Sequence, residues 1–484
     1  MRSWLFLIVA LIVAAATFVL ALSMRGSYGD YLLFAGYVVL QYVVLATAWN
    51  ILGGYCGYVN FGSAAFFAIG AYTTVALHKL GANPGRYLSD TPFEFLGALL
   101  PLSLPALILL GGMVSGLVGF GMGYLTLRLR GVFFAIATLA MAVVLQTIVV
   151  NWDFVGGSRG AYIIRPDAAD LGPVSLAYIQ YLFLLMLLLA VLALWVARTI
   201  ERSRMGLGFA TIRDDETAAE ASGVPTLRLK LAATALSGAL MGMAGAPFPY
   251  YVGYVEPATA FGLPYAVNAI AMPMIGGTTS WAGPLVGALL LGSLQQIATV
   301  TFRSEASLLI VGALLVAFVI AAPVGIVGLM QEFVRAAAPD RLNFRAVAVI
   351  LIASYCFIVG ILGIIFDLTV LQTAFQLPLH QIVNSSAFWI GVFGILVSAL
   401  YLVSAYGLLK LQRWALQLAS LSLLVSMVGS AALIGLDPDP RRLGVRIAMI
   451  VISLAAIVCL RKREIGKLYN SQRGAQPSGQ PVTA

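Results

Sequence analysis

Residues 181–225 read YLFLLMLLLAVLALWVARTIERSRMGLGFATIRDDETAAEASGVP, an apolar run followed at once by a charged segment. The apolar part, 181–197, has no charged side chain, and its length approaches the roughly 20 residues that a helix needs to cross a bilayer. The segment 201–225 carries too many ionised side chains to remain in hydrocarbon, where each of them is costly. We therefore expect the chain to leave the membrane after residue 197.

The same apolar pattern recurs along the whole chain. Residues 4–22 and 307–322 are further examples, and 61% of all residues are hydrophobic against 10% charged. The mean hydropathy of +0.98 is far above that of soluble globular proteins. The runs are uniformly apolar and lack the alternation of outer-membrane strands. The sequence therefore predicts an all-α membrane protein, a polytopic bundle of transmembrane helices.

We expect about ten spans in the first 330 residues and four more after them. The expected spans are 4–22, 31–52, 58–78, 96–127, 131–151, 174–197, 229–250, 264–277, 283–300 and 306–327, then 346–366, 386–407, 414–435 and 443–460. Pro101 and Pro105 predict a kink in the long run 96–127. The short run 264–277 contains Pro273, which predicts a broken or re-entrant segment.

Lysine and arginine residues indicate the orientation of these spans. With the N-terminus in the cytoplasm, the cytoplasmic loops hold about twice as many Lys and Arg residues as the external loops, as the positive-inside rule requires. This places residues 201–225 and both termini in the cytoplasm. The net charge of +9 then reflects orientation and contact with the lipid bilayer, and we expect no nucleic-acid partner.

The charged segment has the pattern of a short helix. Asp214, Asp215 and Glu216 carry the negative charge that a helix N-terminus favours. Gly223 is placed as a C-terminal cap and Pro225 prevents continuation, so we expect a helix over 214–222. We expect the preceding Gly206 and Gly208 to lie in a turn. A solvated loop that only fixes topology is the simpler interpretation, but the length and caps of this segment favour a docking surface.

Five stretches, in order, carry a resemblance to one family. They are GGYCGYVNFGSAAFFAIGAY at 53–72, LRLRGVFFAIATLA at 127–140, NWDFVGGSRG at 151–160, ERSRMGLGFATIRDDETAAEASGV at 201–224 and IGGTTSWAGPLVGALL at 275–290. Together they resemble the permease subunits of bacterial branched-chain amino acid ABC importers. The resemblance covers about residues 30 to 330, and the charged segment corresponds to the family's cytoplasmic coupling loop.

The resemblance implies a multi-pass subunit of the bacterial inner membrane and a set of partners. These are a second homologous permease subunit, two ATP-binding cassette subunits and a periplasmic solute-binding protein. The chain itself is then no enzyme and binds no cofactor, since ATP and Mg belong to the partner ATPase subunits. By resemblance, the contact with the ATPase is made by Glu201, Arg202, Ser203, Gly206, Arg213, Asp214, Asp215 and Gly223.

The source of energy is constrained by what the sequence lacks. No GxxxxGK[ST] phosphate loop occurs, so a partner or an ion gradient must supply the energy. No acidic residue falls in the middle of an expected span, which argues against proton coupling, although a sodium site built of carbonyl groups would escape this test. The scattered residues Cys56, Cys356, Cys459, His78 and His380 show no metal-ligand spacing.

Polar residues in or near the spans are candidates for the substrate path. We single out Tyr58, Asn60, Gly62, Ser63 and Asn268. Hydrogen bonding between helices is the simpler role for such residues. Where the family has Gly-Gln-x-Ser-x-Gly-His, this chain reads Tyr58, Asn60 and Ser63 at the Gln, Ser and His positions. The substrate therefore stays open between branched-chain amino acids and urea, amides or aromatic acids.

Glycine pairs spaced by four residues indicate close helix packing. The pairs are Gly53 with Gly57, Gly238 with Gly242 and Gly283 with Gly287. Such spacing lets two helix backbones approach closely, within this chain or against the second permease. A flexible gate is the alternative role.

The resemblance ends near residue 330, and the rest of the chain is an addition. We expect a permease domain at 1–330, a cytoplasmic linker at 331–345 and a four-helix transmembrane block at 346–484 with a basic, disordered tail. Two alternatives to the importer remain open. One is a 14-span ion-coupled secondary transporter, and the other is a membrane scaffold that does not transport.

Overall fold

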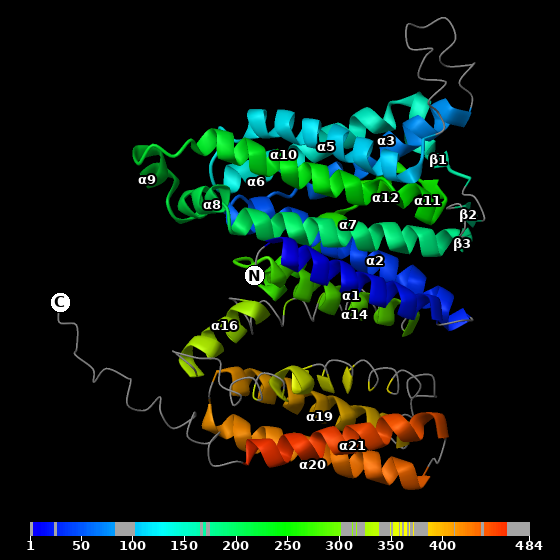
Figure 1. Ribbon diagram of the computed structural model, residues 1–484, viewed down its shortest axis with the longest axis vertical. Coiled ribbons are helices and arrows are strands. Elements are labelled where there is room, and N and C mark those ends of the chain that lie inside the picture. Colours follow the sequence, from blue (N-terminus) through cyan, green and yellow to red (C-terminus); the bar gives the residue numbers. More distant parts are fainter. Residues whose placement is uncertain are drawn as a thin grey trace, which may run out of the picture. The chain divides into compact units, whose positions relative to one another are not determined.

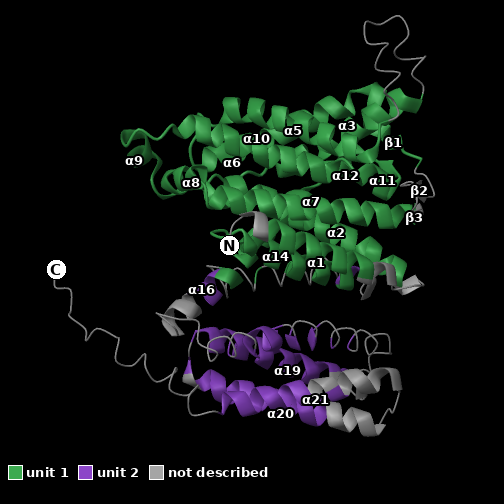
Figure 2. Ribbon diagram, in the orientation of Figure 1, with its two compact units in different colours: residues 1–297, 308–327 green, residues 298–307, 328–484 purple. Residues whose placement is uncertain are grey.

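A computed structural model describes residues 3–23, 27–82, 102–164, 168–170, 175–301, 325–337, 386–410, 412–436 and 440–461, with single helical residues between 312 and 371. The chain divides into two compact units (Figure 2). Unit 1 contains Met1–Ile297 and Leu308–Val327, and unit 2 contains Ala298–Ser307 and Gly328–Ala484.

Unit 1 is a bundle of long apolar helices (Figure 1). They are α1 (Ser3–Ser23), α2 (Ser27–Asn50), α3 (Ser63–Ala82), α5 (Leu104–Thr126), α6 (Val132–Val150), α7 (Tyr178–Glu201), α10 (Thr226–Gly245), α13 (Leu263–Gly276) and α14 (Ala282–Thr301). Shorter helices are α8 (Arg204–Asp214), α9 (Glu216–Ala221), α11 (Phe248–Val252) and α12 (Pro257–Ala260), and a π-helix, Ile51–Tyr55, continues α2. Helix α16 (Ile326–Ala337) includes residues 331–337 of the expected linker.

Eight helices in the described part of the chain are long and apolar enough to cross a membrane. This confirms the all-α polytopic class. The expected span 306–327 lies mostly outside the described residues, as do about half of the expected span 346–366 and Pro101. The kink predicted at Pro105 is wrong, because α5 begins at Leu104 and Pro105 lies in its first turn. Proline is tolerated there, since the first N–H groups of a helix have no partner within it.

Helix α10 lies at the centre of unit 1 and packs through small residues. A Cβ at Gly242 would collide with Ser115 of α5, and a Cβ at Gly70 of α3 would collide with the Gly242 backbone. The carbonyl of Ala244 accepts a hydrogen bond of 3.3 Å from Gln41 of α2. Gly238 also faces α5: a Cβ placed on Gly238 would lie 3.1 Å from the Ser115 carbonyl oxygen. Close approach maximises dispersion contacts, which must hold helices together where lipid is as apolar as the side chains.

A second close contact joins α13 and α14. A Cβ at Gly283 would collide with the Gly277 carbonyl group, and one at Gly287 would collide with that of Met272. Pro273 lies inside α13 without interrupting it, and Gly277 N–H donates to the Pro273 carbonyl oxygen at 2.7 Å. Helix α13 is therefore short but continuous up to Gly276.

Two of the six predicted packing glycines have other roles. Gly53 faces the ring of Trp49, four residues earlier in the same segment. Gly57 has φ +80° and lies in the turn 56–62, against Arg213 of α8. The prediction that this pair packs two helices together is therefore wrong for Gly57, because the helical segment ends at Tyr55 and leaves Gly57 outside it. For the same reason the span expected at 58–78 begins only at Ser63.

The end of unit 1 opposite α8 and α9 carries short strands (Figure 1). Strand β1 (Ala161–Tyr162) pairs antiparallel with β4 (Tyr254–Val255), and β2 (Ala168–Asp170) pairs antiparallel with β3 (Ser175–Ala177). Lys79 at the end of α3 donates to the Phe154 carbonyl oxygen at 2.7 Å. The loops at this end are thus tied to the helices that they connect.

Unit 2 contains α19 (Ser386–Leu409), α20 (Arg413–Leu436) and α21 (Pro440–Leu460). Helical residues between 349 and 371 share an apolar core with them. Asp367 lies one residue beyond the expected span 346–366, and the structure buries its side chain. This residue is helical and buried, and it packs against the apolar span Gly391–Leu409. The hydropathy pattern closed the expected span one residue before it, because a charged residue ends an apolar run.

Candidate functional site

The charged segment forms two helices, α8 and α9, between the ends of α7 and α10 (Figure 1). Ser203 caps α8, since its Oγ accepts a hydrogen bond of 3.3 Å from Gly206 N. The turn predicted at Gly206 and Gly208 is wrong, because both residues lie inside α8. A Cβ at Gly206 would collide with the Ile200 carbonyl, and one at Gly208 would lie 2.7 Å from Leu229. Close packing against α7 and α10 thus outweighs the low helix propensity of glycine.

Helix α9 confirms the short helix that the sequence predicts, with tighter bounds. Asp215 is its N-cap, and Oδ1 accepts from Thr217 N at 2.8 Å and Ala218 N at 3.0 Å. Gly223 follows the helix with φ +81°, and its N–H donates to the Glu220 carbonyl oxygen at 2.9 Å. The caps fix both ends of α9, so its position depends on what it contacts.

The cap at Asp215 supports a first prediction. Replacing Asp215 by alanine removes the acceptor for two N–H groups and should destabilise α9 by about 1 kcal/mol. Amide hydrogen exchange at Thr217 and Ala218 should accelerate accordingly. Asp215→Asn is the matched control, because asparagine caps as well as aspartate, and it should leave the exchange rates near those of the original chain. Equal acceleration in both variants would contradict the capping role.

Glu216 connects α9 to the rest of the bundle. Its carboxylate lies 2.6 Å from Lys230 Nζ of α10 and accepts a short hydrogen bond from the hydroxyl of Tyr58. The side chains are 12% exposed for Glu216 and 4% for Lys230. Lys230 also donates to Tyr58 Oη at 3.2 Å. Arg130, in the turn between α5 and α6, lies 3.8 Å from Glu216 and 3.2 Å from Glu220. One carboxylate thus joins α9 to α10 and to two turns.

This arrangement keeps Glu216 ionised. Burial by itself favours the neutral acid, but hydrogen bonds from Lys230 and Tyr58 and the nearby charges of Lys230 and Arg130 outweigh it, so the pKa of Glu216 lies below its usual value. Burial, with the carboxylate beside it, raises the pKa of the Tyr58 hydroxyl. At neutral pH the site therefore holds a carboxylate at Glu216 and a neutral phenol at Tyr58.

Glu201 makes a second connection at the same end of the bundle. Its Oε2 accepts from Trp281 N at 2.6 Å and from Tyr55 Oη at 3.4 Å. The guanidinium of Arg198 lies 4.1 Å from the ring centre of Phe6 and 5.3 Å from that of Trp281. The last turn of α7 is therefore tied to α1, to the π-helix and to the turn that precedes α14.

The predicted coupling residues separate into two groups by exposure. Arg202, Arg213, Asp214, Asp215 and Gly223 are exposed, and the Asp214 side chain is 72% exposed. Glu201, Ser203 and Gly206 are partly buried and hold the segment in place. Leu207, which the sequence analysis did not single out, is 69% exposed on α8.

The candidates for the substrate path do not form one cluster. Tyr58, Asn60 and Gly62 lie in the turn 56–62, and Ser63 begins α3. Asn60 Oδ1 accepts from Gly62 N at 2.8 Å, and its backbone oxygen accepts from Trp49 Nε1 at 2.9 Å. These residues thus order the turn beside α9.

Asn268 lies elsewhere, on α13, and pairs with Gln295 of α14 at 2.8 Å. This is the interhelical hydrogen bond that a buried amide is expected to make.

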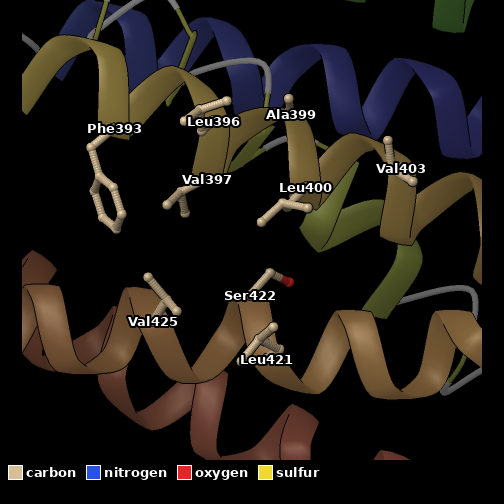
Figure 3. A pocket seen from close by; sticks show the side chains of 9 residues that line it. All are labelled: Phe393, Leu396, Val397, Ala399, Leu400, Val403, Leu421, Ser422 and Val425. Atoms are coloured by element: carbon tan, nitrogen blue, oxygen red, sulfur yellow. The ribbon is translucent and has the colours of Figure 1, made fainter.

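A pocket in unit 2 was not anticipated from the sequence. It has a volume of about 490 Å³ and lies between α19 and α20 (Figure 3). Its lining is apolar apart from Ser422, with Phe393 and Val425 at one side. A zwitterionic solute needs polar partners for its charges, and this lining does not supply them.

The geometry defines a class: a helical membrane subunit with a charged two-helix segment held firmly at one end of its bundle. Residues 31–319, more than half of the chain, match the family described as branched-chain amino acid transport system / permease component, and the chain belongs to this family. The matched region ends before α16 and leaves unit 2 from residue 328 onward outside it.

Individual relatives agree with the family. The high-affinity branched-chain amino acid transport system permease protein LivM of Salmonella typhimurium is 28% identical over 311 residues, 60% of this chain and 68% of the relative. LivM of Escherichia coli gives the same values. The probable branched-chain amino acid transport permease protein LivH of Methanocaldococcus jannaschii is 24% identical over 276 residues, 54% of this chain and 82% of the relative. No solved structure matches the chain significantly.

Proposed function

We propose that this chain is a permease subunit of an ATP-driven importer that moves branched-chain amino acids or a related small polar or zwitterionic solute across the inner membrane. Helices α8 and α9 form the docking site for an ATP-binding subunit. ATP and Mg are bound by that partner, and this chain is not catalytic.

The observation that carries the proposal is the construction of the α8–α9 segment. Its outer face is charged and exposed, whereas Glu216 and Glu201 fix its inner face to α10 and to the turns before α3 and α14. A loop that only marks topology needs no such attachment. A force applied to α9 by a partner would reach these helices through the Glu216–Lys230 pair.

The distribution of positive charge supports a cytoplasmic position for this end. Among the described residues, the end of unit 1 that carries α8 and α9 contains Arg128, Arg130, Arg202, Arg204, Arg213, Arg228 and Lys230. The opposite end contains Lys79 and Arg159. Cytoplasmic loops of membrane proteins carry the excess of Lys and Arg. The end with β1 and β4 then faces the periplasm.

The relatives support two further partners. Both LivM and LivH are named as permease proteins of branched-chain amino acid transport, so a second homologous permease is the expected neighbour. A periplasmic solute-binding protein would deliver the substrate at the end that carries β1 and β4. There, Tyr162 is 81% and Ile164 is 86% exposed.

Purification of the tagged chain from its own cells tests this proposal. The original chain should retain ATP-binding subunits and a second permease in mild detergent. Asp214→Lys should lose most of the ATP-binding subunit, because it reverses an exposed charge without removing a buried contact. Asp153→Lys, exposed at the opposite end, is the control and should retain all partners.

The outcomes separate the two parts of the proposal. Full retention by Asp214→Lys would show that the ATPase docks elsewhere. Purification of the original chain without partners, in more than one detergent, would contradict the importer itself and favour ion-coupled transport.

A further inference from the structure

Asp367 forms a polar contact inside the otherwise apolar unit 2. Its side chain is 9% exposed, and Oδ2 accepts a hydrogen bond of 2.9 Å from the hydroxyl of Ser398, which is 6% exposed. Ser398 lies within the apolar span Gly391–Leu409 of α19. A carboxyl group is therefore enclosed against the middle of a helix that is long and apolar enough to cross the membrane.

Glycine residues make room for this contact on both sides. A Cβ at Gly394 of α19 would collide with the Asp367 carboxyl group. A Cβ at Gly363, one turn before Asp367, would collide with the Ser398 hydroxyl. Gly391 faces the Asp367 backbone: a Cβ placed on Gly391 would lie 3.0 Å from the Asp367 carbonyl oxygen. Three glycines at one contact indicate a site shaped for the carboxyl group.

The helix that encloses Asp367 supplies no positive charge. Residues 386–409 contain no charged residue, and Tyr401 and Tyr406 are their only titratable side chains. In α20 and α21 the charged residues are near the helix starts: Arg413 begins α20, and Arg441, Arg442 and Arg446 lie in the first two turns of α21. Among the described residues, the hydrogen-bond donor to the Asp367 carboxyl group is the neutral hydroxyl of Ser398.

An ionised carboxylate in such surroundings is costly, because α19 is apolar and no cation among the described residues pairs with it. Taking up a proton removes the charge and leaves a neutral acid that keeps the Ser398 hydrogen bond. We propose that Asp367 is a proton-binding site of unit 2, occupied at neutral pH. The ligand is a single proton on the carboxyl group, and its loss would place a charge between apolar helices.

The site makes the stability of unit 2 depend on pH. The folded site holds the proton more tightly than the unfolded chain does, so it stabilises the fold at low pH and this stabilisation is lost as the pH rises. Asparagine has nearly the same shape, accepts the same hydrogen bond and does not titrate. Asp367→Asn should therefore fold normally and should lack this alkaline loss of stability.

Infrared spectroscopy of the full chain in lipid nanodiscs at neutral pH tests the proposal directly. The difference spectrum between the original chain and Asp367→Asn should contain the C=O stretching band of one protonated carboxyl group. Exposed carboxyl groups are ionised at this pH and do not contribute to that band. Asp153→Asn, which changes an exposed carboxylate of unit 1, should leave the band unchanged.

Ser398→Ala provides a second readout. It removes the hydrogen bond to Oδ2 and should shift the band without abolishing it. If Asp367→Asn removes no band, Asp367 is ionised at neutral pH, paired with a cation such as one from α21, and the proposal is overturned. These measurements use no transport partner and are independent of the importer function.

Discussion

Replacing Lys230 by methionine is expected to destabilise unit 1 by about 3–5 kcal/mol, the usual cost of breaking a buried ion pair by removing one partner. The reason is that Glu216, with a side chain only 12% exposed, would keep its charge and lose its closest cation. The free energy of unfolding of the purified chain, measured in nanodiscs against denaturant, gives the effect directly.

Two controls make the Lys230 result specific. Arg130→Met removes a cation that contacts the same carboxylate, but the Arg130 side chain is 57% exposed, so the loss should stay below about 1 kcal/mol. The double variant Lys230→Met with Glu216→Gln removes the uncompensated charge and should regain part of the stability. If Lys230→Met and Arg130→Met cost the same, the pair at α9 and α10 is not the buried connection that we describe.

Replacing Gly242 by alanine is expected to force α10 and α5 apart. The new Cβ would collide with Ser115 and would lie 2.6 Å from the Gly111 carbonyl oxygen, and the backbone cannot yield locally as a flexible side chain can. Overpacking of this kind costs about 1–3 kcal/mol. A lower free energy of unfolding and a reduced yield of monodisperse protein should follow.

Gly121 of α5 is the matched control for Gly242. It lies in a helix of the same bundle, with no atom within 4 Å of the position that a Cβ would occupy. Gly121→Ala should be neutral or stabilising by up to about 1 kcal/mol, since alanine has the higher helix propensity. A loss of stability in Gly121→Ala equal to that in Gly242→Ala would mean that helix contact is not the reason for Gly242.

Rules that depend on neighbouring residues predict the charged segment best. The sequence predicts Gly223 as a C-terminal cap and Asp215 as part of an acidic helix start, because both signals depend on residues within a few positions of one another. The same local reasoning failed at Gly206 and Gly208, which it placed in a turn. Because they lack a side chain, Gly206 can lie close to the Ile200 carbonyl group and Gly208 close to Leu229. Tertiary contacts of this kind override helix propensity.

The candidate site depends on contacts between residues that are far apart in the sequence. Glu216 was noted only as a charge at a helix start, and Lys230 only as one of several cytoplasmic cations. Their partner Tyr58 was assigned to the substrate path, 172 residues from Lys230 along the chain. No periodicity or spacing links residues so far apart, so only the folded bundle brings them together.

The sequence by itself determined that this protein is a polytopic helical membrane protein of the branched-chain permease family, since apolar length and ordered motifs are properties of the chain alone. Only the tertiary structure decided which charges are buried. It pairs Glu216 with Lys230 in unit 1, and in unit 2 it encloses Asp367, which hydropathy had placed outside a span. The reason is physical: hydropathy averages over neighbours in sequence, whereas the cost of a charge depends on its neighbours in space.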